Sequence, residues 1–178
     1  MLAALMVALV GTAHAADWNY VSEIDKMTDE LLANAVFISG NSLSLQPPDD
    51  GENHAVLMIR QRGANEPEVL LIIPKGRIIC DPPTVCFLKA RFDADKSAWI
   101  PAEHPFDGKQ NGLFAIMPRL FIESAKKAKS ILIQVTMQKA GEQVLEFHGS
   151  APLKWDLPPI QRKGKAKRPA ALSVLGKL

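Results

Sequence analysis

A short segment that contains both cysteines constrains the fold of this chain more than any other feature. Residues 68–93 read EVLLIIPKGRIICDPPTVCFLKARFD, and Cys80 and Cys86 are the only cysteines among 178 residues. Apolar runs of this length, bounded by proline and glycine, are typical of strands. Pro82 and Pro83, which lie between the two cysteines, have no amide hydrogen and so exclude ladder hydrogen bonds in the loop. We therefore predict a hairpin whose loop is closed by a disulfide.

The spacing of the two cysteines favours a structural disulfide over a metal or redox site. The C-x5-C pattern differs from the C-x-x-C of redox motifs, and no second pair of Cys or His lies nearby in the sequence to complete a zinc site. In an exported chain, an even number of cysteines is usually paired. Closing so short a loop stabilises the fold by roughly 2 kcal/mol in the loop-entropy model. We expect a Cys80–Cys86 disulfide, no metal and no cofactor.

The first 15 residues, MLAALMVALVGTAHA, have the pattern of a secretory signal peptide, because a small and apolar run ends in Ala-His-Ala. This run is shorter than the roughly 20 apolar residues that span a bilayer. A buried N-terminal helix is the alternative. We therefore expect a periplasmic or secreted protein, with a signal peptide over residues 1–15, a β-rich domain over 16–158 and a basic disordered tail over 159–178.

Short apolar runs separated by turn residues predict a mainly β domain. The expected strands are 31–38, 42–46, 54–60, 69–73, 77–80, 84–91, 131–138 and 143–148. Ser-Gly-Asn at 39–41 predicts a turn, and residues 94–112 predict a loop or a short edge strand. One helix is expected at 118–129, with proline in its first turn and lysines at its end. Because parallel crossovers would need more helices, we expect an antiparallel β-sandwich or a partly open barrel.

A series of short motifs runs from Trp18 to Trp155. In order they are Trp18 and Tyr20 before Asp25-Lys26-Met27-Thr28, Ser39 with Asn41, Leu57 with Arg60, Cys80 and Cys86 leading into Arg91-Phe92-Asp93, Phe121-Ile122 with Lys126, Lys127, Ala128 and Lys129, then Gly141, Phe147 and Trp155. In this order the motifs resemble an uncharacterised family of small exported proteins of Gram-negative bacteria. The resemblance implies export and a β-rich domain, and it implies no activity. The chain departs from the pattern at Arg77 and in its basic tail.

Few side chains of the chain suit catalysis. After the signal peptide there are three histidines, His54, His104 and His148, and no motif of the common hydrolases or nucleotide-binding proteins is present. His104 lies between Glu103 and Pro105 and near Asp107, where it is a candidate base or binding residue; a solvated loop histidine is the alternative. The sequence therefore favours a non-enzymatic protein over an uncommon hydrolase that uses His104 and loop carboxylates.

Arg91 and Asp93 form a second candidate binding site. Two residues apart on a strand, they would point to the same face and contact a partner. A structural ion pair, or an aspartate that stabilises a turn, is the alternative reading.

Positive charge is concentrated in the tail. From residue 159 on there is no acidic residue, and the basic ones are Arg162, Lys163, Lys165, Lys167, Arg168 and Lys177. Removing these six from the 21 basic residues leaves 15 against 19 acidic ones in the rest. Such a tail attracts anionic polymers or lipid surfaces, whereas the lack of interleaved aromatics disfavours nucleic acid. A disordered solubilising extension is the alternative.

Taken together, these features predict an exported, non-enzymatic β-rich protein. Its expected partner is an envelope protein, or an anionic polymer or lipid surface. The expected contact surfaces are the sheet edges and the loops around Asp49 and Glu103.

Overall fold

The computed structural model describes residues 17–80 and 86–156. They form one antiparallel sheet of nine strands in the order β1-β2-β3-β4-β7-β6-β5-β8-β9. The strands are β1 Asn19–Ile24, β2 Leu31–Ser42, β3 His54–Arg62, β4 Glu68–Ile72, β5 Cys86–Phe92, β6 Ala98–Glu103, β7 Gly112–Ala115, β8 Ser130–Met137 and β9 Gly141–His148. The mainly β, antiparallel class predicted from the sequence is confirmed. None of the helical segments in this described part is long and apolar enough to cross a bilayer.

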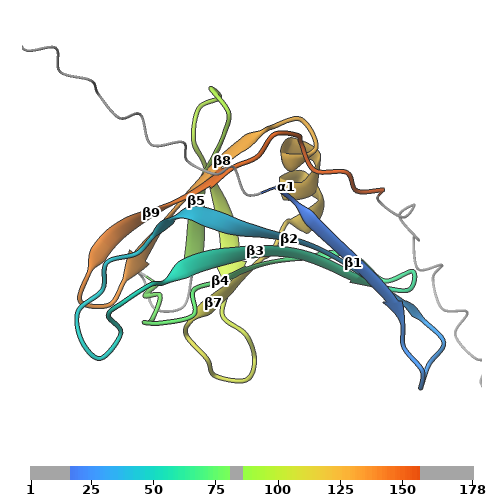
Figure 1. Cartoon of the computed structure of the whole chain (residues 1–178), viewed down its shortest axis with the longest axis horizontal. Coiled ribbons are helices and arrows are strands. Elements are labelled where there is room, and N and C mark those ends of the chain that lie inside the picture. Colours follow the sequence, from blue (N-terminus) through green and yellow to red (C-terminus); the bar gives the residue numbers. More distant parts are fainter. Residues whose placement is uncertain (1–16, 81–85, 157–178) are drawn as a thin grey trace, which may run out of the picture.

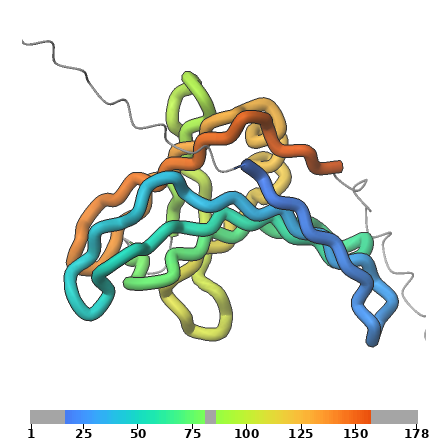
Figure 2. The backbone as a smooth tube through the Cα atoms, viewed as in Figure 1, coloured from blue at the N-terminus to red at the C-terminus, as the bar shows by residue number. Residues whose placement is uncertain are grey.

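The sheet is strongly curved, so that its two ends approach each other without closing a barrel. In Figure 1, β5, β8 and β9 cross over the β1–β4 layer, and the smooth trace of Figure 2 shows the same crossing. Alternate side chains of the strands point into the space between, as period-two patterning requires. The fully buried large side chains of this core include Phe37, Leu57, Ile59, Leu71, Ile73, Ile78, Leu88, Leu113, Phe121, Ile122, Ile131 and Phe147.

Asn41 connects the two ends of the curved sheet. Its Nδ2 donates to the carbonyl of Val144 at 2.8 Å, and its Oδ1 accepts from the amide of Glu146 at 2.8 Å. The expected turn at 39–41 is therefore wrong. β2 continues to Ser42 with a register shift between Ile38 and Ser42, and the Asn41 side chain bonds to β9, a strand far away in the sequence.

Helix α1, Pro118–Ala125, joins β7 to β8 and lies beside the sheet in Figure 1. It begins at Pro118 as expected, but it ends before the lysines that were expected to complete it. The chain then enters β8, and the backbone amides of Lys129 and Ser130 donate to Asp93 Oδ1 at 3.0 and 2.8 Å. These bonds hold residues 129 and 130 in the connection between helix and strand. The lysines at 126, 127 and 129 therefore follow the helix and do not form its last turn.

Two further expectations about strands were wrong. Residues 94–112 contain β6, a central strand between β5 and β7, and they end at the first residue of β7. Pro101 lacks an amide hydrogen, and a proline disfavours a central strand. β6 tolerates it because its ladder with β7 consists of only two residue pairs, both beyond the proline. Residues 77–80, in turn, form no strand but a single bridge between Ile78 and Met137.

Candidate functional site

A groove of about 700 Å³ lies on the outer face of β4 and β7. Its floor is apolar and consists of Leu70, Ile72, Phe114 and Ile116. One wall is the loop between β6 and β7, in which the side chain of Phe106 is 99% exposed. A cavity of this size with an apolar lining has the dimensions of a ligand-binding site.

The floor exists because β4 is apolar on both faces. Val69 and Leu71 point into the core, whereas Leu70 pairs with Phe114 of β7 on the outside. Gly112 keeps the wall close to the floor: a Cβ atom there would lie 3.2 Å from the Leu71 carbonyl oxygen and 3.6 Å from Pro105 Cγ. The unbroken run of apolar residues thus gives β4 apolar side chains on both faces.

The rim of the groove carries charges that largely pair with one another. Arg60 forms an ion pair with Glu68, and its guanidinium carbon lies 5.3 Å from the centre of the Phe114 ring. Lys109 Nζ lies 3.3 Å from Asp107 Oδ2. A hydrogen bond from the Lys109 backbone amide holds the pKa of Asp107 below its usual value. The rim therefore presents no strong field of one sign.

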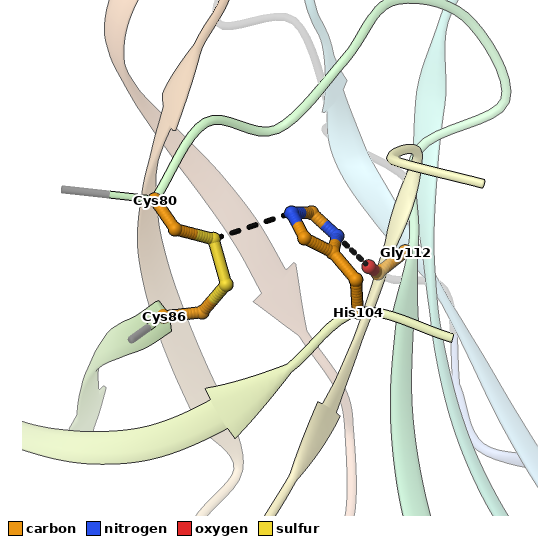
Figure 3. Close-up of a disulfide and its surroundings, with 4 residues drawn as sticks. All are labelled: Cys80, Cys86, His104 and Gly112. Carbon is orange, nitrogen blue, oxygen red and sulfur yellow. Dashed lines mark hydrogen bonds between the residues drawn. A yellow bond between two sulfur atoms is a disulfide. The ribbon is translucent and has the colours of Figure 1, made fainter. Parts of the chain in front are cut away.

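The predicted Cys80–Cys86 disulfide is present, and His104 lies against it (Figure 3). His104 Nε2 is 3.2 Å from Cys80 Sγ, and Nδ1 is 3.0 Å from the carbonyl oxygen of Gly112. This contact between His104 and the disulfide was not expected from the sequence. It follows from the pairing of Cys86 with Ala102, which brings the residue just after β6 next to the start of β5.

The other two histidines lie elsewhere in the sheet. His148, on β9, is exposed; its Nδ1 is 2.9 Å from Ser130 Oγ and its Nε2 3.4 Å from Glu146 Oε2. His54 donates from Nδ1 to the carbonyl of Ser39. The groove is lined by the carboxylates of Glu103 and Asp107, and no histidine is among its described lining residues. Of the residues expected for a hydrolase, the groove therefore contains the two loop carboxylates but not His104.

Arg91 and Asp93 do not share a strand face, because β5 ends at Phe92. Asp93 adopts a left-handed backbone conformation with φ of 47°, and its carboxylate accepts the two backbone amides of the connection into β8. Asp93 therefore stabilises a turn, which was the alternative to a binding role. Arg91 is exposed on β5.

Two predicted regions lie outside the described residues. They are the signal peptide at 1–15 and the tail, with its candidate binding residues Arg162, Lys163, Lys165, Lys167 and Arg168. Comparison of the chain with protein-family models, with curated proteins and with solved structures found no match. The family resemblance inferred from the motifs stays a prediction.

Proposed function

We propose that this is an exported, non-enzymatic binding protein that holds an apolar segment of a partner protein in the groove on β4 and β7. The observation that carries the proposal is an apolar floor on the outside of a sheet that already has a complete core on its inside. Phe106, fully exposed beside this floor, is an anchor residue of the kind that partners bury. Leu70 is buried within the chain at 7% exposure, but Ile116 is 54% exposed, so folding alone gives no reason for an apolar side chain at position 116 or 106.

The charges on the rim support a protein partner over an anionic polymer. Arg60 and Lys109 are each next to a carboxylate, Glu68 and Asp107, and Glu103 adds a further negative charge. A polyanion is attracted by unpaired positive charge, which this rim does not offer. Binding of a polymer or lipid surface would rest on the basic tail.

The same groove has little that suits hydrolysis. The pKa of Asp107 is lowered, whereas a carboxyl that acts as a general acid near neutral pH needs a raised pKa. A base positioned by a third group, as in nucleophilic catalysis, has no counterpart among the described lining residues. Binding without turnover is therefore the function that we propose.

Export is supported by the disulfide together with the predicted signal peptide. Disulfides persist in oxidising compartments and are rare in the cytosol. The periplasm or the extracellular medium is thus the place where we propose that the partner is met.

The test is capture of partners from an envelope extract with matched variants of the full chain. Ile116→Glu places a charge on the floor of the groove, and Phe106→Ser removes the exposed ring. Met27→Ser is the control, because Met27 is 92% exposed in the β1–β2 connection, away from the groove. We expect the wild type and Met27→Ser to retain the same protein, and Ile116→Glu to retain it at least about 10-fold less, which corresponds to ~1.4 kcal/mol of binding.

Equal retention by Ile116→Glu and the wild type would refute the groove as the binding surface. If the captured material is an anionic polymer, and deletion of residues 159–178 abolishes its retention while Ile116→Glu does not, the polymer reading replaces the present one. Folding of each variant is checked by its thermal unfolding midpoint before capture.

A further inference from the structure

The corner that contains the disulfide brings together three groups that ligate soft metal ions. The two sulfur atoms of Cys80 and Cys86 and the Nε2 atom of His104 all lie within 4.8 Å of one another. The three residues come from different elements: Cys80 follows the bridge at Ile78, Cys86 begins β5, and His104 follows β6. Figure 3 shows the imidazole ring of His104 between the disulfide and Gly112.

The hydrogen bond of His104 determines which ring nitrogen is able to bind a metal. A carbonyl oxygen only accepts, so Nδ1, 3.0 Å from the Gly112 oxygen, carries the proton. In the neutral ring, Nε2 then has its lone pair directed toward Cys80 Sγ, 3.2 Å away. Histidine ligands of metal ions typically have this arrangement, with the other nitrogen donating to a backbone carbonyl that fixes the ring.

We propose that, when the disulfide is reduced, Cys80, Cys86 and His104 form a zinc site. Two electrons and two protons from a dithiol reductant convert the disulfide to two thiols, and the reductant becomes a disulfide. Binding of Zn²⁺ then displaces one proton from each thiol, so that two thiolates and one neutral imidazole ligate the ion. Cys2His with one open position is an established zinc ligand set.

The spacing of the three groups suits this ion. Bonds of about 2.3 Å to sulfur and about 2.0 Å to nitrogen in a tetrahedron place ligand atoms roughly 3.5–3.8 Å apart. His104 Nε2 is already 3.2 Å from Cys80 Sγ, and all three groups lie within 4.8 Å of one another. The two sulfur atoms are bonded to each other in the disulfide and have to move apart after reduction to reach this spacing. Cys86 is buried and the other two ligands are half-buried, which limits competition by water for all but the open position.

This inference differs from the sequence-based expectation of no metal site and is independent of the proposed function. The expectation rested on the absence of a nearby second pair of Cys or His in the sequence. The β5–β6 ladder, which pairs Cys86 with Ala102, supplies His104 instead.

The experiment measures zinc bound to the full chain, after reduction by a phosphine and removal of free metal, in competition with a chromophoric chelator. We expect about one Zn²⁺ per reduced chain and none per oxidised chain. His104→Ala should weaken binding at least about 10-fold. His148→Ala is the matched control, because it removes an exposed histidine from β9, and it should bind as the wild type does. Substitution by Co²⁺ should give a thiolate-to-metal absorption band in the wild type that Cys80→Ser/Cys86→Ser lacks.

The proposal is wrong if reduced wild type binds zinc no more tightly than Cys80→Ser/Cys86→Ser, or if His104→Ala binds it as tightly as the wild type. Circular dichroism covers the case in which reduction loosens the fold. Zinc should then restore the β-sheet spectrum of reduced wild type, and should do so for His104→Ala only at a concentration about 10-fold higher or more. Failure of zinc to restore the wild-type spectrum would equally contradict the site.

Discussion

The inner and outer faces of β4 and β7 are both apolar, but they differ in what covers them. Leu71 and Leu113 pair on the inside, where both are almost completely buried by the curved sheet. Leu70 and Phe114 pair on the outside, where the β6–β7 loop forms only a wall beside them. The same two strands therefore carry a face that is enclosed in the core and a face, only partly covered, on which we propose that a partner binds.

Under the proposed function, one apolar segment of sequence serves two purposes. The inner face gains its energy from complete removal of side chains from water and from close packing. On the outer face part of the apolar surface stays exposed to water, and its burial by a partner would contribute to the free energy of binding. Substitutions on the two faces should therefore separate stability from binding, and the following predictions test that separation.

The largest expected effect comes from the inner face. Leu71→Ala removes a side chain with 0% exposure, and we expect the free energy of unfolding to fall by about 2–5 kcal/mol, because the lost burial is accompanied by a cavity. Chemical denaturation measures the change. Leu70→Ala, one residue along on the outer face, is the control and should lose less. Equal losses would mean that the two faces do not differ as described.

The disulfide corner adjoins the groove through Gly112, whose carbonyl accepts the His104 bond. Cys80→Ser/Cys86→Ser should lower the free energy of unfolding by roughly 2 kcal/mol, because the unfolded chain regains the entropy that the closed loop removed. Urea unfolding of this variant and of wild type reduced in the presence of a chelator should give similar midpoints. A variant as stable as the oxidised wild type would show that the disulfide adds nothing to the fold.

Asn41→Ala tests whether the contact between β2 and β9 helps to hold the inner face closed. It removes two hydrogen bonds, to the Val144 carbonyl and from the Glu146 amide. We expect a loss of about 1 kcal/mol in thermal or urea unfolding. Asn65→Ala, at an exposed position between β3 and β4, should be neutral, and a loss as large as that of Asn41→Ala would contradict the role of the contact.

A smaller, pH-dependent effect is expected at Asp17. Hydrogen bonds from the amide and hydroxyl of Ser150, at 2.6 and 2.8 Å, hold the pKa of the Asp17 carboxyl below its ordinary value of 3.8. A lowered folded-state pKa gives stability that is present above pH 3.8 and is lost as the pH falls through the folded value. Asp17→Asn should therefore be less stable than wild type near neutral pH, and the difference should shrink in acid.

Unfolding curves across this pH range measure the effect at Asp17. Ser150→Ala removes the hydroxyl donor and keeps the backbone amide, so it should lose only part of the pH dependence. A constant difference between Asp17→Asn and wild type at all pH values would exclude the assigned cause.

The smallest change in stability is expected for Ile116→Glu, the substitution that should weaken binding strongly. Ile116 is 54% exposed on the floor of the groove, and Ile116→Glu should alter the free energy of unfolding by no more than about 0.5 kcal/mol. Differential scanning calorimetry measures it beside the capture experiment. A large loss of stability would mean that the outer face belongs to the core after all.

Much of the fold was predictable because period-two patterning is a local property. Residues 131–138 and 143–148 were expected as a hairpin, and β8 and β9 are that hairpin. The central position of β6 was not predictable, since Pro101 and the polar residues around it resemble an edge strand. For the candidate site, the disulfide was expected from the cysteines. The groove was not, because the outward direction of Leu70 and Phe114 depends on which strands become neighbours.

By itself, the sequence determined the β-rich class, the disulfide and the pattern of inward-facing side chains. These depend on residues close together in the chain, where alternation, proline and cysteine spacing act directly. Only the tertiary structure decided that β4 lies next to β7, that Asn41 bonds to β9, and that His104 lies 3.2 Å from Cys80. Such contacts join residues far apart in the sequence, and which of them form is decided by the packing of the whole sheet and not by any single segment.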